Sequence, residues 1–184
     1  MKMKVFAAIL IAVLFGACAL EGVNVIGPSG GFVFYDKGRY SDGWRYLEAS
    51  PIDAGKVSRY YLIGEFKGGI SAIGMGKQNT DLILAMPHDE NDGVRRAAQL
   101  CSEFYFGGYK DWFLPSKDDL NQMIKTAERL FPERRYLTST FERTYTYEDE
   151  RTGEIWSIFD DVEVEANKYS GDYTSYHVRP VRRF

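Results

Sequence analysis

The sequence predicts an α+β fold in which two helices accompany small antiparallel sheets. Two segments with the periodicity of amphipathic helices, residues 93–104 and 117–130, occupy the middle of the chain. A short apolar segment, residues 112–114, lies between them. Segments rich in aromatic and β-branched residues lie on either side, at residues 32–49 and 136–183, and predict strands.

The chain begins with a segment typical of a secretory signal. The basic residues of segment 1–4 precede an uninterrupted apolar run, residues 5–14, and the small residues Gly16 and Ala17. The apolar run is short for a membrane-spanning helix, which needs about 20 residues. We therefore expect residues 1–17 to be a signal peptide that is removed from the mature protein.

Cys18 follows this leader in a pattern, LFGAC at residues 14–18, that resembles a bacterial lipobox. Signal peptidase II cuts before such a cysteine, which then carries several acyl chains and anchors the protein stably. Phe15 replaces the preferred leucine, so an ordinary cleavable signal is the alternative. With lipidation at Cys18, residues 18–26 form a tether and residues 27–184 the domain. The next residue is not aspartate, which favours the outer membrane of a bacterial cell envelope.

Residues 32–49 predict the opening β-hairpin. Its first strand, residues 32–35, is followed by the turn signals DKG and SDG and then by a return strand, residues 44–49. Residues 52–80 predict an irregular, glycine-rich surface loop. Within this loop, segment 74–77 (GMGK) lacks the spacing of a phosphate-binding loop. Residues 81–85 (DLILA) predict a short buried helix or turn.

The acidic segment 88–93 (HDENDG) has two interpretations. A calcium loop is one, although the spacing and distal glutamate of an EF-hand are absent. A negatively charged, capped helix start is the other, and we favour it. Cys101 lies on the apolar stripe of the helix that follows, which predicts a buried structural cysteine instead of a nucleophile. The members of this stripe are Val94, Ala97, Ala98, Cys101 and Phe104.

The segment that joins the two helices, residues 107–120, is GGYKDWFLPSKDDL. Its two glycines end the first helix, and the apolar WFL predicts a buried strand that Pro115 terminates. Ser116 predicts the N-cap of the second helix, with its hydroxyl accepting a hydrogen bond from the N–H of Asp119. The buried stripe of that helix is predicted to contain Leu120, Met123, Ile124, Ala127 and Leu130 or Phe131.

The last third of the chain predicts β structure with a charged turn at residues 148–153. The expected strands are residues 136–141, 144–147, 154–159, 162–165 and 176–183.

The segment GGYxDWFLPSxxDL resembles the hallmark of the Lcl C-terminal domain family, a bacterial group. Residues 27–49 resemble the opening hairpin of that family, and residues 176–184 resemble its closing strand. The resemblance implies a C-type-lectin-like fold, in which two helices flank small antiparallel sheets and the N- and C-terminal strands are paired. It also implies adhesion-type roles. The calcium-dependent sugar motifs of that superfold are absent from the sequence, so any sugar binding is expected to proceed without that calcium site.

Composition and motifs argue against several functions. The formal net charge of −3 does not favour a nucleic-acid partner. The two histidines and two cysteines lack zinc-site spacing, so we expect neither a metal nor a cofactor. Nothing in the sequence assembles Ser139 and His177 into a catalytic pair, and we do not expect an enzyme.

Aromatic residues remain as candidates for function, since 3 Trp, 13 Tyr and 12 Phe exceed what one small core needs. Aromatic faces suit both sugar C–H surfaces and protein interfaces, with cross-strand packing as the structural alternative. Arg179, Arg182 and Arg183 suggest either attraction of sulfated polysaccharide or a solvated strand face. The candidate ligand-binding residues are Tyr145, Tyr147, Trp156 and Tyr173.

The sequence thus predicts a lipid-anchored envelope protein with a non-catalytic, lectin-like binding domain. Its expected partner is a glycan or a protein, and the lipid anchor is its contact with the membrane. The alternative is a structural or assembly lipoprotein of the cell envelope that binds a protein partner.

Overall fold

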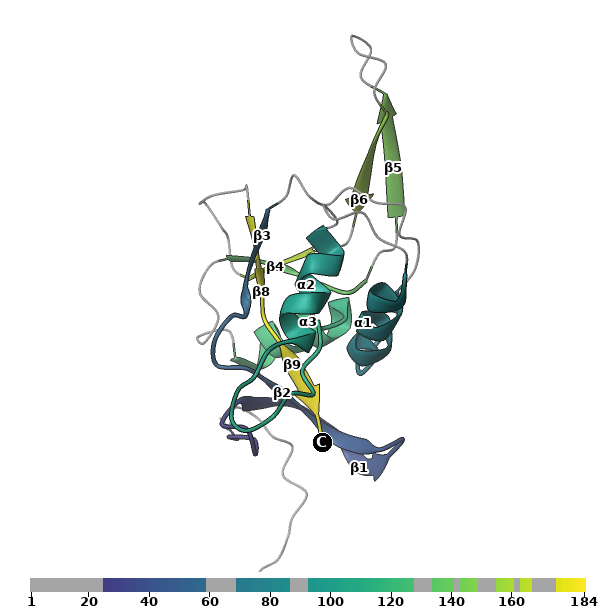
Figure 1. Cartoon of the computed structure of the whole chain (residues 1–184). Helices are drawn as coiled ribbons and strands as arrows, with labels where there is room; N and C mark the ends of the chain where they lie inside the picture. The colour runs from purple at the N-terminus through teal and green to yellow at the C-terminus, as the bar shows by residue number, and fades with distance from the viewer. Residues whose placement is uncertain are drawn as a thin grey trace, which may run out of the picture.

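The computed structural model is a mixed α/β structure, and its described part contains three helices and three small sheets (Figure 1). Among the described residues, no helix combines the length and apolarity needed to cross a membrane. The described residues are 25–58, 69–86, 93–127, 134–140, 143–148, 155–160, 163–166 and 175–184.

The helices are α1 (Gly76–Ala85), α2 (Gly93–Ser102) and α3 (Lys117–Ala127). The strands are β1 (Phe32–Ser41), β2 (Trp44–Ala49), β3 (Gly55–Ser58), β4 (Arg134–Leu137), β5 (Arg143–Glu148), β6 (Ile155–Asp160), β7 (Glu163–Ala166), β8 (Ser175–Val178) and β9 (Val181–Arg183).

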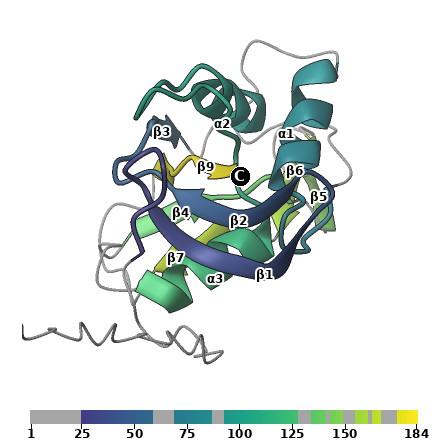
Figure 2. The same ribbon diagram turned by 90° about the horizontal axis from the view of Figure 1, so that it is seen from below.

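Sheet A, the three-stranded sheet, has the order β1-β2-β9, and both of its strand pairs are antiparallel. Seen from below, β1 and β2 cross in front of α3, which packs on this sheet (Figure 2). The prediction that the end of the chain pairs with the opening hairpin is confirmed, since Leu47 lies opposite Arg183 and Ala49 opposite Val181. The final strand adds to β2, not to β1.

Sheet B, the four-stranded sheet, has the order β3-β8-β4-β7. Its β4–β8 pairing is parallel, with Tyr136 opposite His177, so the prediction of purely antiparallel sheets is wrong at this position. The predicted strand 176–183 is broken into β8 and β9, which belong to different sheets. Pro180 lies at the break, where it has no N–H to continue a ladder and its carbonyl oxygen accepts a hydrogen bond from Ser50 N.

Helix α1 includes residues 81–85, for which a short helix or turn was predicted, but it begins at Gly76. Its early start and strand β3 correct the prediction of an irregular loop at residues 52–80, and α1 is a third helix where two were predicted. Glycine at residue 76 suggested a loop, yet α1 begins there because its first turn packs directly on the backbone of residues 114–116. A Cβ at Gly76 would lie 2.7 Å from Leu114 O and 2.9 Å from Ser116 N. Only glycine permits this close approach, so a residue with poor helix propensity starts the helix.

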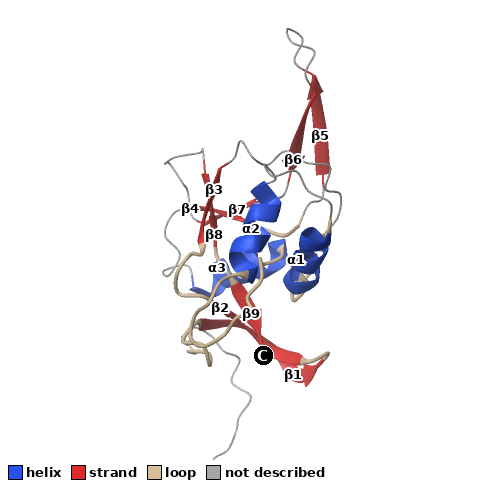
Figure 3. Cartoon of the chain, viewed as in Figure 1, coloured by secondary structure: helices blue, strands red, loops and turns tan. Residues whose placement is uncertain are grey.

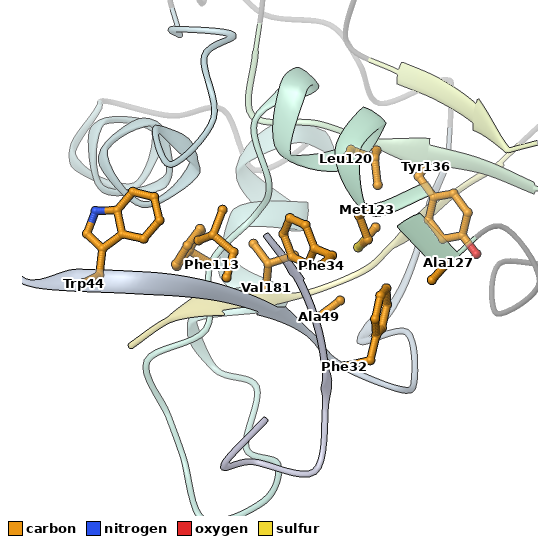
Figure 4. Packing of buried hydrophobic residues seen from close by; sticks show 11 residues of the cluster. Phe32, Phe34, Trp44, Ala49, Phe113, Leu120, Met123, Ala127, Tyr136 and Val181 are labelled. Carbon is orange, nitrogen blue, oxygen red and sulfur yellow. The ribbon is translucent and has the colours of Figure 1, made fainter. Parts of the chain in front are cut away.

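Two hydrophobic clusters form the core. One lies between sheet A and α3, where Phe34, Phe113 and Val181 gather (Figure 4). The other is built around α1, α2, β3 and β8. Burial of the predicted segment 112–114 is confirmed, but the segment forms only an isolated bridge, Phe113 opposite Val181, and not the predicted strand. Its consecutive residues divide between the clusters, since Phe113 belongs to the first and Leu114 to the second. Successive residues of an extended segment point to opposite sides, so this one segment joins both halves of the core.

The apolar stripe predicted for the first helix is confirmed within α2, but Phe104 lies beyond the end of that helix and is half-buried. The stripe predicted for the second helix is confirmed as far as Ala127, with Ile124 partly buried, and the residues beyond lie outside the described part. Val94, Ala97, Ala98 and Cys101 of α2 are buried, as are Leu120, Met123 and Ala127 of α3. Cys101 is completely buried, and burial raises the pKa of its thiol well above its ordinary value. Such a thiol has little thiolate character, which fits the predicted structural role.

The start of α3 is also as predicted. The Asp119 N–H donates to the Ser116 hydroxyl oxygen at 3.1 Å, and the Ser116 N–H donates to the Asp119 carboxylate at 3.0 Å. This reciprocal pair is a capping box with aspartate in the acidic position. The same carboxylate accepts a hydrogen bond from Gly74 N at 2.7 Å, which ties α3 to the segment before α1. Burial raises the pKa of the Asp119 carboxyl, against the effect of these hydrogen bonds.

Candidate binding surfaces

The aromatic candidates of the last third meet on a two-stranded ribbon formed by β5 and β6. The antiparallel register places Tyr147 opposite Trp156 and Tyr145 opposite Ile158. Because directly opposed positions and alternate positions along a strand share one face, Tyr145, Tyr147 and Trp156 fall on the same face of the ribbon. Figures 1 and 3 show the ribbon extending from the end of the molecule opposite sheet A.

Three of the four predicted ligand-binding residues are thus brought together by strand pairing. The fourth, Tyr173, lies outside the described residues, as do Cys18 and the acidic segment up to Asp92. Within the part of the chain that the structure describes, no group of three or more His, Cys, Asp or Glu residues is arranged to hold a metal ion.

A second surface is formed by the loop between α2 and the buried segment 112–114, here called the aromatic loop, residues 103–111. Phe106 and Tyr109 hydrogen-bond to each other through their backbones at 3.0 and 3.2 Å, and Gly107 and Gly108 form the turn between them with φ of 61° and 87°. The turn packs on the chain near β1, since a Cβ at Gly107 would lie 1.9 Å from Ser29 O. This contact fixes the position of the loop.

The inner side of the aromatic loop packs on Trp112. The Phe104 and Phe106 rings meet the Trp112 ring at centroid distances of 5.6 and 6.4 Å, both edge to face. The indole N–H of Trp112 donates to the Tyr109 carbonyl oxygen at 3.2 Å. Tyr105, between the two phenylalanines, is 64% exposed. Alternation along the loop therefore places two half-buried rings against Trp112 and one ring on the surface.

Arg182 of β9 joins the aromatic loop to sheet A. It is 4% exposed, and its Nε and Nη2 donate to the Asp111 carboxylate at 2.8 and 2.9 Å. Its Nη1 donates to Glu48 of β2, which is completely buried. The guanidinium carbon lies 3.8 Å from the centroid of the Tyr109 ring. Burial opposes the charge of Arg182, but its hydrogen bonds with Asp111 and Glu48 prevail and raise the pKa of the guanidinium.

Arg179 is held in a similar way. It is 5% exposed, donates from Nε to Asp53 at 2.6 Å and donates from Nη1 to the Ser50 carbonyl oxygen at 3.0 Å. The other oxygen of Asp53 pairs with Nδ1 of His177 at 2.8 Å. Both suggestions for the terminal arginines are therefore wrong for Arg179 and Arg182, which are buried in ion pairs. Sequence could not reveal this, because the carboxylate partners lie 71 to 134 positions away along the chain.

Ser139 does not form the catalytic pair that its sequence position left open. Its hydroxyl donates to the Pro115 carbonyl oxygen at 3.0 Å and receives an N–H from Asn79 at 3.3 Å. His177 is engaged by Asp53, and its ring centroid lies 5.9 Å from that of Tyr136. Ser139 thus connects the segment after β4 to Pro115 and to Asn79 of α1, and His177 connects β8 to Asp53.

Comparison with known proteins adds no relative. No protein-family model, no curated protein and no solved structure matches the chain.

Proposed function

We propose that the protein is a lipid-anchored protein of the bacterial cell envelope whose domain binds a glycan and performs no chemistry. The observation that carries the proposal is the β5–β6 ribbon, which places Tyr145, Tyr147 and Trp156 on one face of an element that extends from the body. Tyrosine and tryptophan offer large apolar faces with a polar edge, which suits the mixed surface of a sugar.

The position of the ribbon supports this role. Val25, the first described residue, lies at the sheet A end of the molecule, and its carbonyl oxygen accepts a hydrogen bond from Val33 N of β1. The ribbon extends from the other end (Figure 1). A tether attached before residue 25 would therefore hold the sheet A end near the membrane and leave the ribbon directed away from it.

We also propose a C-type-lectin-like fold for this domain. The resemblance of the segment at residues 107–120 to the Lcl C-terminal domain family supports it, as does the pairing of the final strand with the opening hairpin. A shared fold does not fix a ligand, so the proposal of glycan binding depends on the aromatic ribbon.

Replacing both Tyr147 and Trp156 by alanine is expected to weaken glycan binding more than tenfold. Loss of a central aromatic anchor costs about 2 kcal/mol or more of binding free energy, and each 1.4 kcal/mol raises the dissociation constant about tenfold. The measurement is binding of residues 19–184 to an array of glycans and polysaccharides, with and without EDTA. The matched control replaces Thr146 and Ser157, which are the next opposed pair and fall on the other face.

Three results of this experiment would count against the proposal. Equal loss in the Thr146 and Ser157 control would mean that the ribbon fold matters and its aromatic face does not. Abolition of binding by EDTA would indicate a metal site, which the proposal does not contain. Absence of binding to every glycan would favour the alternative, a structural or assembly lipoprotein that uses the ribbon to bind a protein.

Replacing Cys18 by serine tests the anchor. The wild-type protein is expected in the membrane fraction of the producing bacterium, and Cys18→Ser in the soluble fraction or retained with an uncleaved leader. Metabolic labelling with a palmitate analogue should mark the wild type alone. Labelling of both proteins, or of neither, would contradict lipidation at Cys18.

A further inference from the structure

The aromatic loop borders an open hollow of about 620 Å³, which lies apart from the β5–β6 ribbon. Its lining combines one aromatic ring with three polar side chains, and this volume is within the range of about 300–1,000 Å³ typical of small-molecule sites. The lining residues are Ser102, Glu103, Tyr105 and Lys110.

Tyr105 supplies an exposed ring at the hollow. The ring is 64% exposed, while its neighbours Phe104 and Phe106 pack on Trp112 beneath it. The backbone that carries the ring is fixed by the Phe106–Tyr109 hydrogen bonds and by the contact of Gly107 with Ser29. A rigidly held aromatic face loses little conformational entropy when a ligand covers it.

The polar groups of the hollow retain their hydrogen-bonding capacity. Lys110 Nζ lies 5.6 Å from the Tyr105 ring centroid, and the side chains of Lys110 and Glu103 form no hydrogen bond or ion pair with another described residue. The Ser102 hydroxyl donates to the Gln99 carbonyl oxygen at 3.0 Å, which leaves its oxygen free to accept. The hollow therefore offers donors from Lys110 and acceptors from Glu103 and Ser102.

The charges in the hollow indicate the class of ligand. Among the described lining residues, one ammonium and one carboxylate give no net charge, so an anionic or cationic ligand would meet one repulsive group. An uncharged ligand with several hydroxyls and an apolar face can use all four residues. We propose that this hollow binds one pyranose ring of an uncharged saccharide, with its C–H face on Tyr105 and its hydroxyls on Glu103, Lys110 and Ser102.

This inference shares the ligand class of the proposed function and concerns a different site, so the two can fail separately. The test titrates residues 19–184 with the methyl β-pyranosides of glucose, galactose and N-acetylglucosamine, observed by saturation-transfer NMR. We expect saturable binding of at least one of them. Tyr105→Ala should weaken it at least tenfold, while Tyr105→Phe, which keeps the ring, should weaken it less than threefold.

Tyr40 provides the matched control, because it is 69% exposed and lies on β1 away from the hollow. Tyr40→Ala should leave pyranoside binding unchanged, and thermal melting should show that both alanine variants are folded. The proposal is overturned if no pyranoside binds, or if Tyr105→Ala binds as tightly as the wild type. Pyranoside binding that survives in the Tyr147 and Trp156 variant supports the hollow, even where polysaccharide binding to the ribbon has failed.

Discussion

Replacing Arg182 by methionine is expected to lower the free energy of unfolding by about 3–5 kcal/mol, as found when one partner of a buried ion pair is removed. Glu48 would lose its ion-pair partner in a completely buried position, and its Oε2 has no hydrogen-bond partner among the described residues. Its remaining oxygen depends on Arg182. Asp111 would also lose both of its charge-assisted hydrogen bonds and Tyr109 its stacked guanidinium.

Urea denaturation of residues 19–184 measures this loss. Arg183→Met is the matched control, since Arg183 is the neighbouring strand residue, is only half-buried and should change stability by less than about 0.5 kcal/mol. Adding Glu48→Leu to Arg182→Met should recover part of the loss, because an apolar pair removes the unpaired charge. A loss below about 1 kcal/mol for Arg182→Met, or no recovery in the double variant, would contradict the role given to this pair.

Replacing Gly107 by alanine is expected to cost about 2–5 kcal/mol. Its φ of 61° alone costs an alanine roughly 1–2 kcal/mol. The new Cβ would also lie 1.9 Å from Ser29 O, a backbone atom that cannot rotate away. Forcing such groups apart typically costs a further 1–3 kcal/mol or so.

A variant of the adjacent Gly108 separates the cost of backbone strain from the cost of the clash with Ser29. Its φ is 87°, yet a Cβ there would meet nothing within 4 Å. Gly108→Ala should therefore cost only the backbone strain, roughly 1–2 kcal/mol. Equal losses for the two variants in chemical denaturation would show that the contact between the turn and Ser29 contributes nothing. If the contact fixes the aromatic loop, Gly107→Ala should also weaken pyranoside binding more than Gly108→Ala does.

Features that depend on residues close together in the sequence were predictable. The stripes of α2 and α3 follow from apolar residues three and four positions apart, and the capping box follows from Ser116 and Asp119. The ribbon followed from two alternating segments around a charged turn, and this pairing alone aligned Tyr147 with Trp156. Each of these signals lies within a few residues, so no tertiary contact was needed to interpret it.

Features that depend on distant contacts were not predictable. Gly76 begins a helix because the backbone near Leu114 approaches it, and no local pattern reports that approach. Arg182 looked like a surface residue because its partners Glu48 and Asp111 are remote in sequence. The hollow beside Tyr105 was missed for a similar reason. The packing of the adjacent phenylalanines on Trp112, which leaves Tyr105 exposed, is a tertiary feature that no local pattern reports.

The place of β9 in sheet A also affects how the protein folds. The middle strand, β2, is made early, while the strand that completes its second edge comes from residues 181–183. Contacts between such distant segments form slowly, because a long loop must close before they contribute. Until residues 181–183 pair with β2, that strand keeps an open edge and the core lacks Val181. Completion of sheet A therefore depends on closing the long loop between β2 and β9.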